Sequence, residues 1–489
     1  MSFNKTTIVG LEVHVQLKTK SKLFCGCATT FGASPNTQTC PVCIGAPGAL
    51  PVINRQALKL AIKTGLALHC QIEPRTRWDR KNYFYPDLPK GYQISQLDRP
   101  ICREGYLDLI DPQSKSGERR VKIERAHLEE DAGKSSHDET LLGGPTKIDF
   151  NRAGTPLLEI VTQPDLRSGH EARTFLDELK LILSNLDVSD CNMQEGSLRV
   201  DANVNLHLSG EQGKRATPIV EIKNLNSFRS VERAIEFEAE RQFRQYHEDG
   251  FTISQAPKQT RGWDDTTGQT VLQRIKEDSA DYRYFPDPDL VVIHTTKADI
   301  QSIRAEIKPL PAERRRMLMS RYLLPAYDAD VLVRQGDPFV DFFETVAAEV
   351  GDGKLVSNWL QQELLRHLNA NHTKIEACPI DANQFIDFLQ RIQSRDLDSS
   401  HAKDVFERMM EDSISVEQAM DRLGIKSIGP EELTAICQSV LDENPEIIEQ
   451  ICNGNSKAIG NLIGKTKSLN KNVSPSQARE QILKMLPKQ

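Results

Sequence analysis

Residues 10–17, GLEVHVQL, alternate strictly between apolar and polar side chains, and this pattern constrains the fold more than any other feature of the chain. Successive side chains of a β-strand point to opposite faces of the sheet, so the apolar residues share one face and Glu12, His14 and Gln16 share the other. The stretches 197–208 (SLRVDANVNLHL) and 220–228 (VEIKNLNSF) continue the alternation. The sequence therefore predicts a sheet that buries one face and carries polar side chains on the other.

The length and the changing periodicity indicate several domains. At 489 residues the chain is longer than a single hydrophobic core usually serves. Residues 1–293 show short strand patterns between Gly, Pro and Asn clusters, with helices expected around 170–187 and 229–248, which predicts an α+β domain with an antiparallel sheet. Apolar residues at helical spacing predict an all-α helical bundle domain over 294–405 and an all-α tail domain over 406–489. We expect a multi-domain protein in this order.

Composition and charge exclude some functional classes. No segment approaches the run of about 20 apolar residues that a membrane span needs, and residues 1–10 show no targeting pattern, so we expect a cytoplasmic protein that does not contact membranes. A net charge of −7 argues against general coating of nucleic acid. Residues 453–489, however, carry seven Lys or Arg and one Glu, a net charge of +6. This asymmetry indicates that the tail contacts a polyanion.

The polar faces of the predicted strands have two interpretations. One solvated face of an antiparallel sheet is the commonest reason for such alternation. Acids together with His, Asn and Arg are also what a site for a hard cation and phosphate needs, because Mg²⁺ is held by carboxylates, phosphates and water. Acids that would join Glu12 are Glu129, Glu130, Asp131 and Glu159. Glu159 stands among apolar residues, where an unpaired carboxylate is costly, so it is the better functional candidate.

Four of the ten cysteines are close together in the sequence, namely Cys25, Cys27, Cys40 and Cys43. Two short-spaced pairs that flank a loop can place four thiolates around a tetrahedral ion, which predicts a structural zinc site. The alternative is four free structural cysteines. The other six cysteines are scattered, which is not typical of a secreted chain stapled by disulfides.

The segment IGNLIGKTKS (459–468) ends in the Gly-Lys-Thr of a phosphate-binding loop. Gly460 lies one residue too close to Gly464 for that motif, and no strand pattern precedes it, so we reject a P-loop here. A helix and turn whose lysines approach a nucleic-acid backbone fit the segment better.

Long segments of the chain resemble a known protein family. They are VGLEVHVQL (9–17), DRKNYFYPDLPKGYQISQ (79–96), HLEEDAGKSSH (127–137), DFNRAGTPLLEIV (149–161), EGSLRVDANVN (195–205), EIKNLNSFRSVERAIEFE (221–238), DYRYFPDPDL (281–290), LPAYDADVL (324–332) and KAIGNLIG (457–464). Together they resemble the B subunits of aspartyl/glutamyl-tRNA amidotransferases, the GatB/GatE family with a YqeY-like tail. The resemblance covers essentially the whole chain.

The resemblance implies a ligase that forms a carbon–nitrogen bond with glutamine as the amide donor. The B subunit would use ATP and Mg²⁺ to phosphorylate the side-chain carboxylate of Glu-tRNA(Gln), Asp-tRNA(Asn) or both. Ammonia tunnelled from the amidase A subunit would displace the phosphate to give Gln-tRNA(Gln) or Asn-tRNA(Asn), and a small C subunit would complete a heterotrimer. The α+β domain would be the cradle and kinase, and the tail would bind tRNA through salt-sensitive phosphate contacts.

The resemblance also implies site residues. The catalytic residues would be Glu12, His14, Glu130 and Glu159, of which His14, Glu130 and Glu159 would hold Mg²⁺. We further expect the residues Arg152, Arg199 and Lys223 at the ATP phosphates, Lys81 and Tyr83 at the mouth of the ammonia tunnel, and Lys457, Lys465 and Lys467 at the tRNA. Tyr83, Phe84 and Tyr85 are alternatively core aromatics. Cys25, Cys27, Cys40 and Cys43 match the family's zinc knuckle.

Two rival functions remain at this point. One is a non-catalytic, zinc-containing tRNA-binding module that presents substrate to an amidase. Acidic side chains such as Glu12 would repel a polyanion, so they argue against a protein that only binds tRNA unless a cation lies between the acids and the tRNA. The other rival is the archaeal-type, Glu-specific homologue, which carries an extra inserted domain. No such insertion is visible in the 489 residues.

Overall fold

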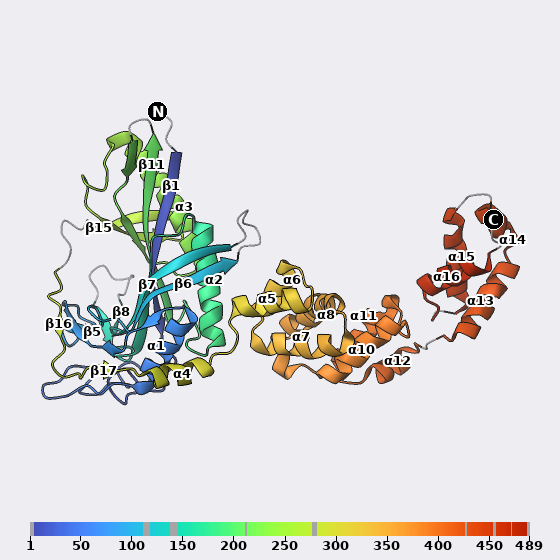
Figure 1. Cartoon of the computed structure of the whole chain (residues 1–489), viewed down its shortest axis with the longest axis horizontal. Helices are drawn as coiled ribbons and strands as arrows, with labels where there is room; N and C mark the ends of the chain where they lie inside the picture. Colours follow the sequence, from blue (N-terminus) through green and yellow to red (C-terminus); the bar gives the residue numbers. More distant parts are fainter. Residues whose placement is uncertain are drawn as a thin grey trace. The chain divides into compact units, whose positions relative to one another are not determined.

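The computed structural model describes residues 4–110, 118–136, 145–210, 213–275, 281–425, 428–452, 456–470 and 472–486. The chain divides into two compact units, residues 1–314 and 315–489. All strands of the described residues belong to the first unit, and the second unit is helical (Figure 1). The expected order of an α+β region followed by a helical region is therefore confirmed, whereas the expected domain boundaries at 293/294 and 405/406 stay predictions.

A sheet of ten strands forms the centre of the first unit (Figure 1). Its order is β15-β14-β13-β11-β1-β10-β7-β6-β2, with β12 paired to β11. The strands are β1 (Asn4–Gln16), β2 (Gln71–Ile72), β6 (Cys102–Ile110), β7 (Glu118–Glu130), β10 (Pro156–Thr162), β11 (Leu198–Gly210), β12 (Gly213–Ala216), β13 (Val220–Lys223), β14 (Gln259–Asp264) and β15 (Gln269–Ile275). All paired neighbours run antiparallel except β13 and β14, so the expected antiparallel sheet contains one parallel pair.

Three smaller sheets lie outside this one. Their strands are β16 (Phe285–Pro286), β4 (Asp79–Asn82) and β5 (Tyr92–Ser95) in one sheet, β17 (Ile293–His294) and β3 (Arg75–Thr76) in the second, and β8 (Lys134–Ser136) and β9 (Lys147–Asp149) in the third. The pairing of β16 with β4 joins two parts of the chain that are far apart in the sequence.

Helices α1 (Arg55–Ala67), α2 (Gly169–Asn185) and α3 (Phe228–Asp249) pack on the apolar face of the large sheet. Leu60, Phe175 and Ile235 of these helices share one hydrophobic core with Val13 and Val200 of the strands. Each fully buried side chain of this size contributes about 1.5–3 kcal/mol relative to exposure. Helices α2 and α3 were predicted, whereas α1 was not. Helix α4 (Lys297–Ala305) packs on α1.

A β-bulge in β7 changes which residues of that strand face the core. The register between β10 and β7 shifts between Val161 and Thr162, so β7 carries one extra residue relative to its partner. On the amino-terminal side of the bulge, the core residues of β7 are Val121 and Ile123. On its carboxyl-terminal side, they are Ala126 and Leu128. The bulge thereby turns the odd-numbered residues that follow toward the polar face.

The described part of the second unit is built from helices. The helices are α5 (Pro311–Arg321), which begins in the first unit, α6 (Ala326–Arg334), α7 (Asp337–Val350), α8 (Gly353–Trp359), the π-helical Leu360–Leu364, α9 (Leu365–Ala370), the 3₁₀ turn Ile375–Ala377, α10 (Ala382–Ser394), α11 (Ser399–Asp412), α12 (Val416–Leu423), α13 (Pro430–Asp442), α14 (Pro445–Cys452), the 3₁₀ turn Ser456–Ala458, α15 (Ile459–Leu469) and α16 (Pro475–Met485). Phe385 packs on Phe406 of α11, a helix that runs across the expected boundary at 405/406. Cys437, Leu462 and Ile482 belong to a separate core of α13, α15 and α16.

Membrane-spanning helices were not expected. None of the described helices combines the length and the apolar character that crossing a membrane requires.

Candidate active site

The register of the large sheet aligns polar side chains from four strands. His14 of β1 lies opposite Glu159 of β10 and also opposite Arg199 of β11. Glu159 in turn lies opposite His127 of β7. Residues directly opposite each other project from the same face, with Cβ atoms about 4.5–5.5 Å apart. The pairing therefore builds a transverse row of His127, Glu159, His14 and Arg199 across the polar face.

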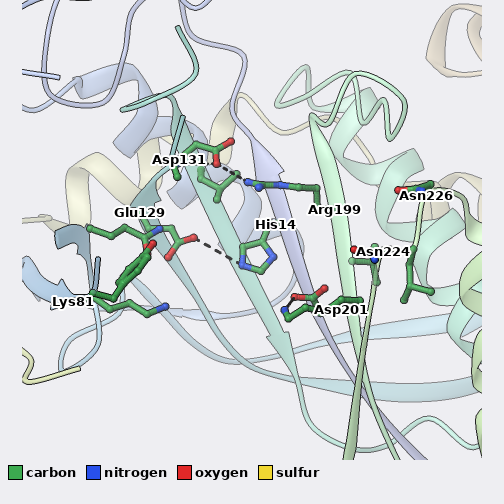
Figure 2. A pocket seen from close by; sticks show the side chains of 15 residues that line it. His14, Lys81, Glu129, Asp131, Arg199, Asp201, Asn224 and Asn226 are labelled. Carbon is green, nitrogen blue, oxygen red and sulfur yellow. Dashed lines mark hydrogen bonds and ion pairs between the residues drawn. The ribbon is translucent and has the colours of Figure 1, made fainter. Parts of the chain in front are cut away.

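Three of the side chains on this face form a cluster that can hold a metal ion. His14 Nε2 lies 3.4 Å from Glu159 Oε2 and 3.8 Å from Glu129 Oε1. One ligand atom from each of the three residues lies within 4.8 Å of the others. Figure 2 shows the Glu129 carboxylate directed at the His14 ring. We call His14, Glu129 and Glu159 the sheet cluster.

Burial and mutual charge perturb the pKa values within this group. Burial alone would lower the pKa of His14, but the hydrogen bond and charge of Glu159 and the charge of Glu129 raise it to about 9. Burial and the charge of Glu159 raise the pKa of Glu129 to about 7. Burial lowers the pKa of His127 to about 4, so this imidazole is neutral near pH 7. Perturbed groups that face a pocket are typical of functional sites.

Glu130, expected as a magnesium ligand, is not part of the sheet cluster. Its buried carboxylate forms an ion pair with Lys90, and Oε1 accepts a hydrogen bond from the Ile94 backbone N–H at 2.9 Å. Adjacent strand residues face opposite sides, so Glu129 occupies the place expected for Glu130. The sequence held a signal for this arrangement, because apolar Leu128 belongs to the core and Glu130 must share its face.

Asp131 fixes the cationic end of the row. Its carboxylate accepts hydrogen bonds from Arg199 Nη2 and from Gln16 Nε2, both at 2.8 Å. Arg152 Nε lies 3.5 Å from Asp131 Oδ2 and donates to the Ala132 carbonyl at 3.0 Å. Burial would raise the pKa of Asp131, but the charges of Arg199 and Arg152 lower it. Arg152, expected at the ATP phosphates, contacts Asp131 and does not line the pocket described next.

A pocket of about 430 Å³ opens over the sheet cluster (Figure 2). Its lining residues are His14, Lys81, Tyr83, Gln93, Glu129, Asp131, Ala132, Leu157, Arg199, Val200, Asp201, Lys223, Asn224, Leu225 and Asn226. Lys223 Nζ lies 2.5 Å from Asp201 Oδ2 and 2.8 Å from Glu221 Oε1. Arg199 Nε is buried and has no hydrogen-bond partner among the described residues. The pocket therefore combines acids near His14 with two fixed cations, Arg199 and Lys223.

Lys81 and Tyr83, expected at a tunnel mouth, both line this pocket. Lys81 Nζ lies 5.8 Å from the Tyr83 ring centroid, and the Tyr83 hydroxyl donates to Gln93 Oε1 at 3.2 Å. Phe84 and Tyr85 are not core residues, since 88% of Phe84 and 62% of Tyr85 are exposed.

Glu12 lies on the His14 face of β1 but outside the pocket. Its Oε1 accepts a hydrogen bond from Asn203 Nδ2 at 2.9 Å. The structure thus places Glu12 beside the sheet cluster and does not bring it into the cluster.

The four cysteines of the predicted zinc knuckle come together. Their sulfur atoms all lie within 4.8 Å of one another, an arrangement that can hold a metal ion and is compatible with zinc. The Cys43 sulfur accepts hydrogen bonds from the Cys40 backbone N–H at 3.2 Å and from the buried Lys22 Nζ at 3.5 Å. Interaction with Cys25 and the positive charge of Lys22 lower the pKa of Cys43 to about 4. A thiolate is the form that binds metal.

The tail lysines lie on or near helix α15. Lys457 and Lys465 are exposed and Lys467 is half-buried. Lys465 donates to the Asn444 side chain. The Gly-Lys-Thr segment is part of the continuous helix Ile459–Leu469, so the rejection of a P-loop there is confirmed.

Comparisons with known proteins agree with this architecture. Residues 7–301 match the family model of the GatB/GatE catalytic domain, and residues 341–486 match that of the GatB domain. A Rhodopirellula baltica protein, named as the B subunit of an aspartyl/glutamyl-tRNA(Asn/Gln) amidotransferase, is 54% identical over 483 residues, covering 99% of this chain and 97% of that protein. This chain belongs to the GatB/GatE family.

Other relatives support the same conclusion over the full length. Proteins of the same name from Moorella thermoacetica and Caldanaerobacter subterraneus are 46% and 43% identical, covering 94% and 98% of this chain, respectively. The resemblance in the sequence motifs is therefore confirmed, and with it the role of a GatB-type amidotransferase subunit. The matched catalytic domain contains β1, β7, β10 and β11, the strands that carry the row and the sheet cluster.

Proposed function

We propose that this GatB-family chain phosphorylates the side-chain carboxylate of Glu-tRNA(Gln), Asp-tRNA(Asn) or both with ATP. A carboxylate oxygen is a poor leaving group, whereas an acyl phosphate loses phosphate readily when ammonia attacks the carbonyl. The products are Gln-tRNA(Gln) or Asn-tRNA(Asn). One observation carries the proposal, namely that His14 and Glu129 of the sheet cluster line a single pocket together with Arg199 and Lys223.

The two carboxylates of the sheet cluster fit Mg²⁺, which prefers oxygen ligands. His14 would join them as a neutral imidazole, because a metal ligand must give up its proton. Two carboxylates and one imidazole are few protein ligands, and Mg²⁺ sites usually keep positions for substrate phosphates and water. When bound there, Mg²⁺ would neutralise negative charge on the transferred phosphoryl group. Glu12, two residues from His14 on the same face, is a candidate for supporting the cluster from its edge.

Cationic side chains of the chain would bind and orient the phosphates. Asp131 fixes one end of the Arg199 guanidinium at 2.8 Å, and the buried Nε–H is left without a partner among the described residues. A fixed N–H donor that faces a phosphate oxygen stabilises charge without reorganisation during the reaction. Lys223 adds a second positive charge at the same end. Arg152 would act indirectly, by holding Asp131.

The amide nitrogen would come from a separate subunit. We propose an amidase A subunit that releases ammonia from glutamine and a small C subunit that completes a cytoplasmic heterotrimer. Lys81 and Tyr83 are candidates for the tunnel mouth, because both line the pocket next to Glu129. Zinc in the four-cysteine site would be structural, since four sulfur ligands leave no open position.

The tail would hold the body of the tRNA. Lys457, Lys465 and Lys467 lie in a segment with a net charge of +6. Contacts of this kind go to phosphates, so binding should weaken with salt and depend little on sequence.

A non-catalytic tRNA-binding module is the second candidate function. Such a module gains nothing from Glu129 and Asp131 in a pocket for a polyanion unless a cation lies between the acids and the polyanion. The buried acids of the pocket therefore favour the enzyme.

The test is phosphate release from ATP by the reconstituted three-subunit complex, with and without Glu-tRNA(Gln). We expect release that depends on the charged tRNA in the wild type and is lost in Glu129→Ala and Glu159→Ala, while glutaminase activity survives. Unchanged hydrolysis in both variants would overturn the assignment of the sheet cluster. Charged tRNA that binds with no ATP-dependent step in the wild type would favour the binding module.

A further inference from the structure

Four tyrosines form a group beside Lys81, and one of them, Tyr83, lines the pocket. The ring centroids of Tyr83 and Tyr85 are 6.1 Å apart, those of Tyr83 and Tyr282 are 6.0 Å apart, and those of Tyr282 and Tyr284 are 6.1 Å apart. Lys81 Nζ lies 5.0 Å from the Tyr282 ring centroid. We call the four residues the tyrosine cluster. The phosphorylation proposed above assigns no role to Tyr85, Tyr282 or Tyr284.

Backbone pairing fixes the position of the tyrosine cluster. Strand β16 pairs with β4, and the Asn82 side chain donates to the Tyr282 carbonyl, 200 positions away, at 3.2 Å and to the Arg283 carbonyl at 2.7 Å. Arg80 Nε donates to the buried Asp287 at 2.7 Å. These bonds hold the segment in place before a ligand binds. The segment therefore does not have to become ordered on binding, a step that would reduce the affinity.

The tyrosine cluster extends from the reacting centre toward solvent. Tyr83 lines the same pocket as Glu129. Burial and the charges of Glu159 and Glu129 raise the pKa of Tyr284. At the other end, 62% of Tyr85 is exposed. A flat group can therefore reach the rings from solvent while its attached parts reach the sheet cluster.

The two ends of the pocket differ in chemistry. Figure 2 shows Glu129 and Lys81 to the left of His14, while Arg199 comes from the right and its guanidinium reaches above His14 to Asp131. Arg199 and Lys223 suit the negative charges of a triphosphate. The aromatic faces suit an unpaired base. ATP therefore fits the Arg199 end, and the tyrosine end is left for the second substrate.

On the basis of the proposed function, we propose that the tyrosine cluster binds the adenine base of the terminal adenosine of the charged tRNA by stacking. A tRNA ends in single-stranded CCA, and its amino acid is esterified to the terminal ribose, so this adenine lies one sugar away from the amino acid. Unpaired RNA bases are commonly recognised by stacking on aromatic side chains. An adenine held at the rings would direct the side-chain carboxylate toward Glu129 and the sheet cluster.

Stacking on the base has a consequence for specificity. The contact is independent of the attached amino acid, so the same anchor serves Glu-tRNA and Asp-tRNA. The choice between the two would then be made by the rest of the pocket and by the body of the tRNA.

The test measures KM for Glu-tRNA(Gln) and for ATP with the reconstituted complex. In Tyr282→Ala and Tyr85→Ala we expect KM for the charged tRNA to rise about 5- to 150-fold, which corresponds to about 1–3 kcal/mol of base stacking. KM for ATP should stay within about twofold, and Tyr282→Phe should restore the wild-type value because it keeps the ring. Phe84→Ala is the matched control, since Phe84 is 88% exposed and makes no ring contact with the tyrosine cluster in the described chain.

A second readout does not depend on the folding of the variants. Uncharged tRNA whose terminal adenine is replaced by 2-aminopurine should lose fluorescence when it binds to the wild-type complex, because stacking quenches this base. Absence of quenching, or unchanged KM for the charged tRNA in both alanine variants of an active enzyme, would overturn the inference. A rise in KM for ATP alone would show that the rings bind the adenine of ATP, and it would overturn the proposal that they bind the terminal adenine of the tRNA. A wild-type complex without charged-tRNA-dependent phosphate release would instead overturn the proposed function.

Discussion

The sheet cluster and the four-cysteine cluster both gather metal-ligating atoms within 4.8 Å, but the chain builds them in different ways. The cysteines come from one short segment, residues 25–43, and their spacing in the sequence already reveals them. The three residues of the sheet cluster come from β1, β7 and β10, and only the register between these strands brings them together. A local site can be read from sequence, whereas a site on a sheet face depends on pairing.

The two sites also differ in what surrounds them. His14 and Glu129 of the sheet cluster line a pocket of about 430 Å³ together with the cations Arg199 and Lys223. Four thiolates around an ion leave no position for a substrate. Under the proposed function, a metal ion would support catalysis at the sheet cluster and stability at the four-cysteine cluster.

Changing an acid of the sheet cluster should have the largest effect on the reaction. We expect Glu159→Gln to lower ATP-dependent phosphate release at least about 100-fold, because charge stabilisation by a metal ion contributes several kcal/mol. Single-turnover phosphate release with Glu-tRNA(Gln) measures this effect. The melting temperature should change little, and a variant that keeps more than a tenth of the wild-type rate would contradict the role of Glu159.

The neighbouring acid on the other face should affect stability instead. Glu130→Gln leaves the largely buried ammonium of Lys90 beside a neutral partner, and breaking a buried ion pair costs about 3–5 kcal/mol. Denaturant unfolding of the subunit measures the loss. The double variant Glu130→Leu with Lys90→Met should recover most of it, because apolar replacements of a buried pair are often neutral. A fully stable Glu130→Gln variant that has lost phosphate release would reverse the roles of Glu129 and Glu130.

Replacement of Arg199 separates charge from geometry in the pocket. The arginine guanidinium binds Asp131 with one N–H group and offers a second N–H group to the pocket. A lysine keeps the positive charge but has no planar group that can do both. We expect Arg199→Lys to lower phosphate release roughly 10-fold and to raise KM for ATP. Arg152→Lys serves as the control on the other side of Asp131 and should have a smaller effect. Equal losses in the two variants would argue that both arginines only position Asp131.

The tail should show the smallest effect. Lys457→Ala removes an exposed cation. Log affinity for nucleic acid falls as log salt rises, and loss of one phosphate contact should make this slope shallower by about 0.9. Titration of tRNA binding at several salt concentrations measures this slope. Lys374→Ala, an exposed lysine outside the tail, should leave the slope unchanged. An identical change in both variants would mean that the tail makes no special contact with tRNA.

Local patterns explain which parts of the fold and site were predictable. The alternation in residues 10–17 and 197–208 predicted β1 and β11, and helical spacing predicted α2 and α3. The resemblance names Glu130 as a ligand, and that assignment stays a prediction, whereas the structure places Glu129 on the face of His14. Only the alternation beside apolar Leu128 indicated this in the sequence, because strand propensities do not report the bulge in β7. The position of Tyr282 beside Tyr83 was equally hidden, since it follows from a pairing between segments 200 positions apart.

The most direct test of the central claim is a titration with Mn²⁺, followed by electron paramagnetic resonance, as a stand-in for Mg²⁺ that also prefers oxygen ligands. The zinc content of the same samples is measured in parallel. We expect Glu129→Gln to lose Mn²⁺ binding and keep its zinc, and Cys43→Ser to keep Mn²⁺ binding and lose zinc. Loss of Mn²⁺ binding in Glu130→Gln, with Glu129→Gln unchanged, would contradict the sheet cluster as the catalytic metal site.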